Sequence, residues 1–92
     1  MREKELERKL KKAVEERGGA CLKLSSAFCV GLPDRLVLLP QGKATFVETK
    51  ARGKKPSAVQ LARHETLKNL GFRVVVLDNE KSLDELLQKN AL

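Results

Sequence analysis

The sequence predicts an α/β protein with the element order αβββαβα, in which a central mixed sheet is flanked by helices. Three observations support this fold class. Residues 3–17 carry apolar side chains at helical spacing, which predicts an amphipathic helix. Residues 31–51 have the pattern of two strands joined by a turn. Residues 72–77 (FRVVVL) form a continuous apolar run after a second helical segment, which predicts a fully buried, parallel strand reached by a right-handed crossover.

The first helix is predicted to stop at a pair of glycines. Gly18 and Gly19 follow its apolar stripe, and glycine adopts the left-handed conformation that commonly ends helices. A first strand over residues 20–24 and a loop over residues 25–32 come next. The residues of the apolar stripe are Leu6, Leu10, Ala13 and Val14.

The hairpin over residues 31–51 carries most of the candidate chemistry. Glu48 and Lys50 lie two apart on its second strand, so their side chains point to the same face. If the turn around residues 41–43 has an odd number of residues, Asp34 falls opposite Lys50 and diagonal to Glu48 on that face. An even turn would direct Asp34 to the other face.

In the odd register, two carboxylates converge beside one ammonium group. This arrangement suits a hard divalent cation such as Mg²⁺, which takes one or two carboxylate ligands and retains several waters. Beside such a metal, Lys50 can orient or help to deprotonate a water, and it can offset the charge that develops on a phosphate.

The remaining elements follow the hairpin directly. Residues 51–56 (ARGKKP) form a basic loop without aromatic residues. Ser57 can cap a helix that runs to residue 70, with Gly71 as its stop. After the apolar strand, residues 82–88 predict a last helix. No internal repeat or second domain is visible, so residues 1–92 are expected to form a single domain.

The charge balance favours a polyanionic partner. The 92 residues carry a formal net charge of +7, and the sequence pI is about 9.7. Because Trp and Tyr are absent, contact with backbone phosphates is favoured over base stacking. We expect a cytoplasmic protein, since there is neither an apolar signal segment nor a membrane-spanning run. The candidate phosphate contacts are Ser25, Ser26, Arg35, Arg52, Lys54 and Lys55.

Some of these polar residues have plainer interpretations. The loop with Ser25 and Ser26 is equally well a simple connection, and Arg35 is equally well a cation at a sheet edge. The two cysteines are too few for a disulfide framework. A zinc site lacks donors, because His64 is the one further soft ligand in the sequence. For His64 itself, a surface or helix-packing role is favoured over general-base catalysis.

Pro33-Asp34 followed by Glu48-Thr49-Lys50 resembles the motif of the PD-(D/E)XK nuclease superfamily. The wider context is similar to the VRR-NUC (virus-type replication-repair nuclease) branch in its stand-alone form, and the resemblance covers nearly the whole chain. The segments that carry it are GLPDRLVLL, FVETKA, GKKPSAVQ and LGFRVVVLD. The resemblance implies a restriction-endonuclease-like core.

The resemblance also implies roles for particular residues. Asp34 and Glu48 would bind the metal with help from a carbonyl near Thr49, and Lys50 would assist the attacking water. An acid of the first helix would join them, and Glu7 is favoured over Glu3 and Glu5; a solvated Glu7 paired with Lys11 is the alternative. Gln60 would orient a water or a phosphate, unless it is an ordinary surface residue.

The function expected is Mg²⁺- or Mn²⁺-dependent, structure-specific cleavage of DNA, and the resemblance implies that it leaves a 5′-phosphate and a 3′-hydroxyl. The specific prediction is a homodimer that resolves Holliday junctions in a prokaryotic cell or a phage-infected host. Its interface is expected on the last helix, around Leu83, Leu87 and Leu92, or on the first helix. The alternatives are a monomeric nuclease acting on flaps, nicks or splayed arms, a catalytically silent DNA-binding protein, and a protein-interaction module.

Overall fold

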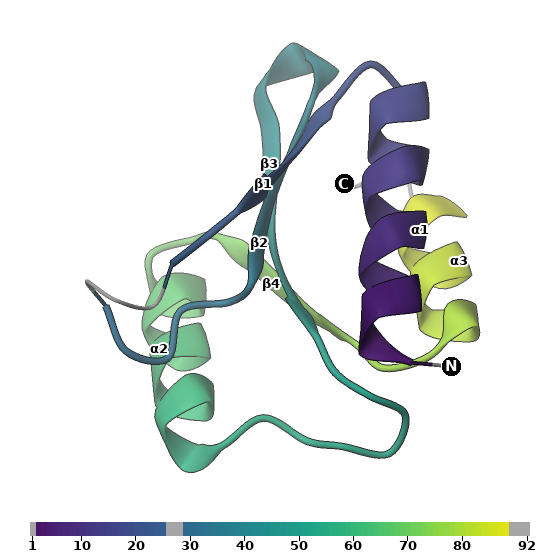
Figure 1. Ribbon diagram of the computed structural model, residues 1–92. Coiled ribbons are helices and arrows are strands. Elements are labelled where there is room, and N and C mark those ends of the chain that lie inside the picture. The colour runs from purple at the N-terminus through teal and green to yellow at the C-terminus, as the bar shows by residue number, and fades with distance from the viewer. Residues whose placement is uncertain (1, 26–28, 89–92) are drawn as a thin grey trace.

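A computed structural model of the chain describes residues 2–25 and 29–88. Its elements follow the predicted order, and the described strands form one mixed sheet in the order β1-β2-β3-β4 (Figure 1). The predicted fold class is therefore confirmed. The elements are α1 (Glu3–Glu16), β1 (Ala20–Lys23), β2 (Arg35–Leu39), β3 (Lys43–Thr49), α2 (Ala58–Asn69), β4 (Arg73–Leu77) and α3 (Glu80–Gln88).

The last strand of the sheet pairs in parallel, as its apolar sequence predicted. β1, β2 and β3 are antiparallel neighbours, whereas β4 runs parallel to β3 and aligns Thr49 with Leu77. The prediction of full burial was wrong. β4 lies at the edge of the sheet, and Leu77 is its one buried residue.

The turn between β2 and β3 sets the register of the hairpin. Pro40–Gly42 form a tight turn in which Gln41 (φ 72°) adopts the left-handed conformation. The turn has an odd length, as expected, but it lies one residue earlier than predicted. Proline cannot donate a ladder hydrogen bond, so Pro40 leaves the strand and begins the turn. Arg35 then pairs with Val47, and one step further Asp34 lies across from Glu48 instead of Lys50.

One face of the sheet holds the hydrophobic core. α1 and α3 lie together on this side (Figure 1). The helices and strands contribute alternate residues to the core, as the 3.6-residue and two-residue periods require. The buried core residues are Leu6, Leu10, Val14, Cys21, Val37, Val47, Leu77, Leu83 and Leu86.

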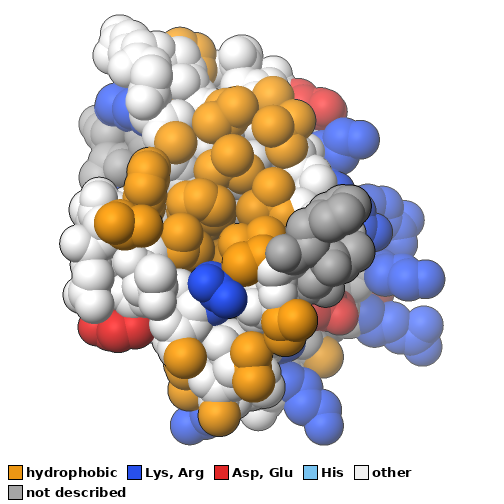
Figure 2. All heavy atoms as spheres, turned by 90° about the vertical axis from the view of Figure 1, so that its left-hand side faces the viewer, with side chains coloured by type: hydrophobic (Ala, Val, Ile, Leu, Met, Phe, Trp, Pro, Cys, Tyr) orange, Lys and Arg blue, Asp and Glu red, His pale blue; other side chains and the backbone are white. Residues whose placement is uncertain are grey.

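The opposite face of the sheet is apolar but only partly covered. α2 lies over one end of it, and Figure 2 shows hydrophobic side chains gathered on the part that α2 leaves open. The strand residues whose register places them on this face are apolar apart from Glu48. Several are more than a third exposed; with the adjoining Phe72, these are Leu22, Leu38 and Val76. We call this set the apolar sheet face.

Side-chain caps fix where the last two helices begin. Ser57 caps α2, as predicted: its Oγ accepts from the backbone N–H of Gln60 at 3.2 Å. α3 begins two residues before the predicted start, because the Asn79 side chain accepts from the backbone N–H of Ser82 at 2.7 Å. Within the described part of the chain, none of the helices is long and apolar enough to cross a membrane.

Candidate active site

The end of β3 brings together an acid from α1 and an acid from the segment directly before β2. Thr49 donates its backbone N–H to Asp34 Oδ2 at 3.0 Å, and its hydroxyl oxygen lies 2.9 Å from the same carboxylate oxygen. The Thr49 hydroxyl also lies 3.0 Å from Glu7 Oε1. A hydroxyl has a single hydrogen and can donate to one of these carboxylates at a time. Glu7 of α1 and Asp34 are thus held against the same residue of β3.

Glu48 lies on the opposite face of β3, beneath α2. Its side chain is 1% exposed. Oε2 accepts from Gln60 Nε2 at 3.1 Å and pairs with Lys50 Nζ at 3.1 Å. Oε1 has no hydrogen-bond partner, and His64 Nε2 lies 3.9 Å from it.

Gln60 connects the cap of α2 to this carboxylate. Its Oε1 accepts from the backbone N–H of Ser57 at 2.9 Å and completes a capping box, while its Nε2 donates to Glu48. Both ends of the amide are therefore used, and its orientation is fixed. This contact supports a site role for Gln60 over the plain surface residue that the sequence left open.

The electrostatics of the site favour a cation near Glu48 and Asp34. Burial raises the pKa of the Glu48 carboxyl, the negative charge of Asp34 adds to the rise, and Lys50 opposes it. Two carboxylates that interact, with one ammonium group paired to Glu48, lack positive charge. Since Mg²⁺ is bound through one or two carboxylates and retains its waters, the donor set of Asp34 and Glu48 fits it, with the partnerless Glu48 Oε1 as a ready ligand.

Glu7 is not part of a ready-made metal cage. Over residues 2–25 and 29–88, no group of three or more His, Cys, Asp or Glu side chains is arranged to hold a metal ion. Glu7 Oε2 instead pairs with Arg35 Nη2 at 3.4 Å. Because Glu7 contacts Thr49 and Arg35, the solvated alternative is disfavoured, while its catalytic role stays a prediction.

The structure divides the candidate phosphate contacts into two groups. Arg35 lies on the inner strand β2, so it is not a cation at a sheet edge. Its side chain is 13% exposed and forms an ion pair with Glu7. Arg52, Lys54 and Lys55 are exposed on the loop between β3 and α2, which directly follows the strand that carries Glu48. Ser25 is exposed after β1, and Ser26 lies outside the described residues.

His64 lies on the buried side of α2 and is 3% exposed. Burial lowers the pKa of its imidazole, and the charges of Lys68 and Lys50 lower it further, so the ring is neutral at neutral pH. Of the roles weighed from the sequence, helix packing is the one that the structure supports.

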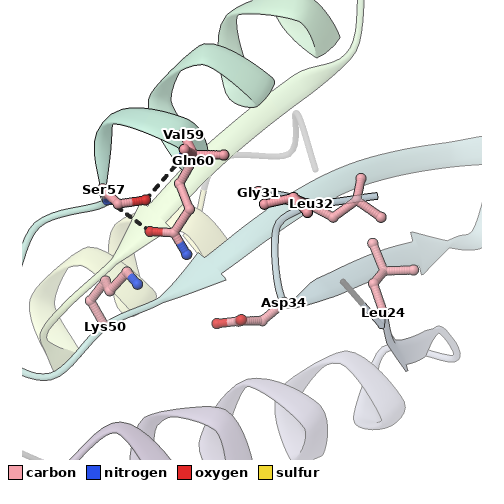
Figure 3. A pocket seen from close by; sticks show the side chains of 9 residues that line it. Leu24, Gly31, Leu32, Asp34, Lys50, Ser57, Val59 and Gln60 are labelled. Atoms are coloured by element: carbon pink, nitrogen blue, oxygen red, sulfur yellow. Dashed lines mark hydrogen bonds between the residues drawn. The ribbon is translucent and has the colours of Figure 1, made fainter. Parts of the chain in front are cut away.

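A pocket beside the carboxylates has no counterpart among the sequence predictions. It has a volume of about 430 Å³ and opens directly on Asp34, Lys50 and Gln60 (Figure 3). Its walls come from segments that are distant in sequence, so no local motif marks it. The other residues that line it are Leu24, Val30, Gly31, Leu32, Ser57 and Val59.

Known proteins resemble this chain over most of its length. No protein-family model matches the chain. "Putative nuclease p44" of Acyrthosiphon pisum secondary endosymbiont phage 1 is 46% identical over 80 residues, which are 87% of this chain and 86% of that protein. A solved structure described as a VRR_NUC domain superposes with a TM-score of 0.89 at 36% identity and covers 96% of both chains.

The fold and the similarity to these two proteins define the class to which this protein belongs. The chain belongs to the VRR-NUC family. The resemblance found in the sequence is thereby confirmed over nearly its whole length.

The buried Glu48 predicts a pH-dependent cost to the metal-free protein. Its pKa is raised on folding, so the stability linked to its protonation is present below the unfolded value near 4.5 and is lost as the pH rises through the folded value. Glu48→Gln removes this loss. In EDTA, the variant should unfold at a higher urea concentration than wild type at pH 7.5. The difference between the two urea midpoints should become smaller toward pH 4.5. A difference that does not change with pH would contradict this interpretation.

Proposed function

We propose that this protein is a Mg²⁺- or Mn²⁺-dependent endonuclease that hydrolyses phosphodiester bonds in structured DNA. The observation that carries the proposal is the convergence of Asp34, Glu48 and Lys50 at the end of β3, directly before an exposed basic loop. The kinship with a phage protein named as a nuclease supports it. That kinship also favours the cytoplasm of a prokaryotic cell or phage-infected host as its location.

Each residue of the site has a part in this chemistry. Asp34 and Glu48, with the carbonyl of Thr49, would hold the metal. When bound, the metal would lower the pKa of an attacking water and offset charge on the phosphate. Lys50 Nζ, 3.1 Å from Glu48, is placed to orient that water and to neutralise the charge that develops on a phosphate oxygen. Gln60 keeps the Glu48 carboxylate in a fixed plane. Hydrolysis of the bond between phosphorus and the 3′ oxygen leaves a 5′-phosphate and a 3′-hydroxyl.

For the substrate, we propose a branched DNA recognised by shape. The net charge of +7 and the exposed basic loop favour phosphate contacts, which carry no base sequence. A four-way junction requires two symmetric cuts, and a twofold homodimer places two sites for them. Resolution of Holliday junctions by a homodimer is therefore the specific proposal. A monomeric flap or nick nuclease and a silent DNA-binding protein are the alternatives.

The structure changes the surface proposed for the dimer. The sequence suggested Leu83, Leu87 or the first helix, but Leu83 lies in the core, Leu87 packs against it, and the apolar stripe of α1 is buried. Leu92 lies outside the described residues. The apolar sheet face is open instead, so a second copy of the chain is proposed to pack there (Figure 2).

Substitutions at the three central residues test the nuclease proposal. Asp34→Ala and Glu48→Ala should reduce cleavage of branched DNA in Mg²⁺ below detection, because each removes a metal ligand. Lys50→Ala should also abolish cleavage but leave metal binding, measured by calorimetry, largely intact, since an ammonium group is not a ligand. Metal-dependent cleavage at the wild-type rate by Glu48→Ala would refute the site.

The basic loop should control the salt dependence of DNA binding. For a duplex arm, the slope of log K against log salt falls by about 0.9 for each phosphate that the protein no longer neutralises. Replacing Arg52, Lys54 and Lys55 with Gln should therefore reduce the slope by up to about 2.7 for every sequence alike. Lys81→Gln, on α3, is the single-charge control and should leave the slope unchanged. An unchanged slope in the triple variant would mean that the loop is merely solvated.

The dimer is tested through the apolar sheet face. Light scattering should give the mass of a dimer for wild type and of a monomer for Leu38→Glu, because a carboxylate buried in an apolar interface is costly. On a supercoiled cruciform plasmid, the dimer should produce linear DNA by paired cuts, and the variant should accumulate nicked circles. A wild-type monomer at all concentrations would favour the flap or nick nuclease.

A further inference from the structure

The pocket beside the carboxylates has two chemically different ends. In Figure 3, Lys50 and Gln60 gather at one end and Leu24 and Leu32 at the other, with Asp34 between them. Val30 and Val59 add to the apolar lining. Among the described residues that line the pocket, Asp34 and Lys50 alone are charged. The far end is therefore unsuited to a phosphate and suited to an apolar group.

The apolar wall is built by close contacts between separate segments. Arg63 Nε of α2 donates to the carbonyl of Val30 at 3.2 Å and ties the chain before β2 to the helix. Gly31 (φ +85°) passes so close to α2 that a Cβ added there would lie 2.8 Å from the Val59 carbonyl oxygen. A glycine is required here both by the left-handed backbone and by the contact. The volume of about 430 Å³ lies in the usual range of sites for small organic groups.

The groups that adjoin a bound phosphate identify the occupant. In DNA, a phosphate at the polar end is followed at once by a deoxyribose and its base, whose faces are largely apolar. A base that is paired and stacked in a duplex cannot enter a pocket, whereas an unpaired base can turn out of the stack. The aliphatic lining offers contact to the face of any base and no hydrogen-bond pattern that selects one.

We infer that this pocket receives one unpaired nucleoside adjoining the scissile phosphate. The inference rests on the proposed nuclease function and adds a selection rule to it. Phosphate contacts on the basic loop bind any DNA, and the pocket restricts productive binding to a position where a nucleotide is free to leave its stack. Cleavage then depends on local unpairing and is independent of the identity of the base.

Val59 and Leu61 provide a matched test. They lie two residues apart on α2 and are 52% and 54% exposed, but only Val59 lines the pocket. The substrates are three forms of one junction: fully paired at the cut, with one unpaired nucleotide there, and with a tetrahydrofuran abasic residue in place of that nucleotide. Wild type should cut the unpaired form with a kcat/KM about 10-fold above that of the abasic form.

Val59→Ser should lose about 10-fold in kcat/KM on the unpaired form and should cut it no better than the abasic form. Leu61→Ser should behave as wild type on all three. A 2-aminopurine at the unpaired position, bound in EDTA so that no cleavage occurs, should change in emission with wild type and Leu61→Ser but not with Val59→Ser.

Equal cleavage of the unpaired and abasic forms by wild type, or equal behaviour of the two variants, would overturn the pocket assignment. A wild-type protein that cuts none of the DNA forms in Mg²⁺ or Mn²⁺ would refute the nuclease proposal instead. The 2-aminopurine emission would then decide alone whether the pocket takes an unpaired nucleoside.

Discussion

The burial of the Glu48 carboxylate is the constraint on which the candidate site depends. An ionised group that is 1% exposed is tolerated only when it is paired and hydrogen-bonded. Lys50, directly after the same strand, pairs with the carboxylate, and Gln60 of α2 donates a hydrogen bond to it. Because Gln60 also completes the capping box of α2, the start of that helix and the contact with Glu48 are linked. The remaining deficit of positive charge is what a divalent cation would supply.

One face of the sheet holds the hydrophobic core, and the other holds most of the candidate site. α1 and α3 cover one face with a continuous aliphatic core, which provides most of the burial that stabilises a small domain. α2 covers a limited part of the other face, where the buried acid, the pocket and the apolar sheet face lie. Glu7 and Thr49 belong to the core side but reach Asp34 at the end of the strands. Substitutions in the aliphatic core can thus alter stability without touching the α2 side directly.

Local patterns explain which features the sequence could predict. The period of two placed Glu48 and Lys50 on one face, and the helical stripe identified the buried side of α1. The predicted cross-strand partner of Asp34 was two residues away from the observed one. The reason is that the position of the turn depends on one residue, here Pro40, more than on the strands themselves. Gln60 contacts a residue of another segment, and the pocket is lined by segments that are distant in sequence. No local sequence pattern predicts contacts of this kind.

The burial of β4 was also not predictable from its local sequence. An apolar run such as FRVVVL predicts burial on both faces, yet Val76 is more than a third exposed because β4 is an edge strand and α2 reaches only one end of the sheet. The apolar run shows only that the strand can pack against apolar groups on both faces. Whether a helix of the chain covers the second face depends on the length and position of α2, which residues outside β4 determine.

The three-residue turn at Pro40–Gly42 has an evolutionary consequence. Side chains alternate along a strand, so inserting or deleting one residue in this turn would reverse one strand of the hairpin relative to the other. Asp34 and Glu48 would then be separated by the thickness of the sheet, although every residue of the motif would still be present. Length changes at this turn are therefore restricted to steps of two, or to single insertions that a bulge absorbs. Family members that keep both acids but differ by one residue here should carry such a bulge in β2 or β3.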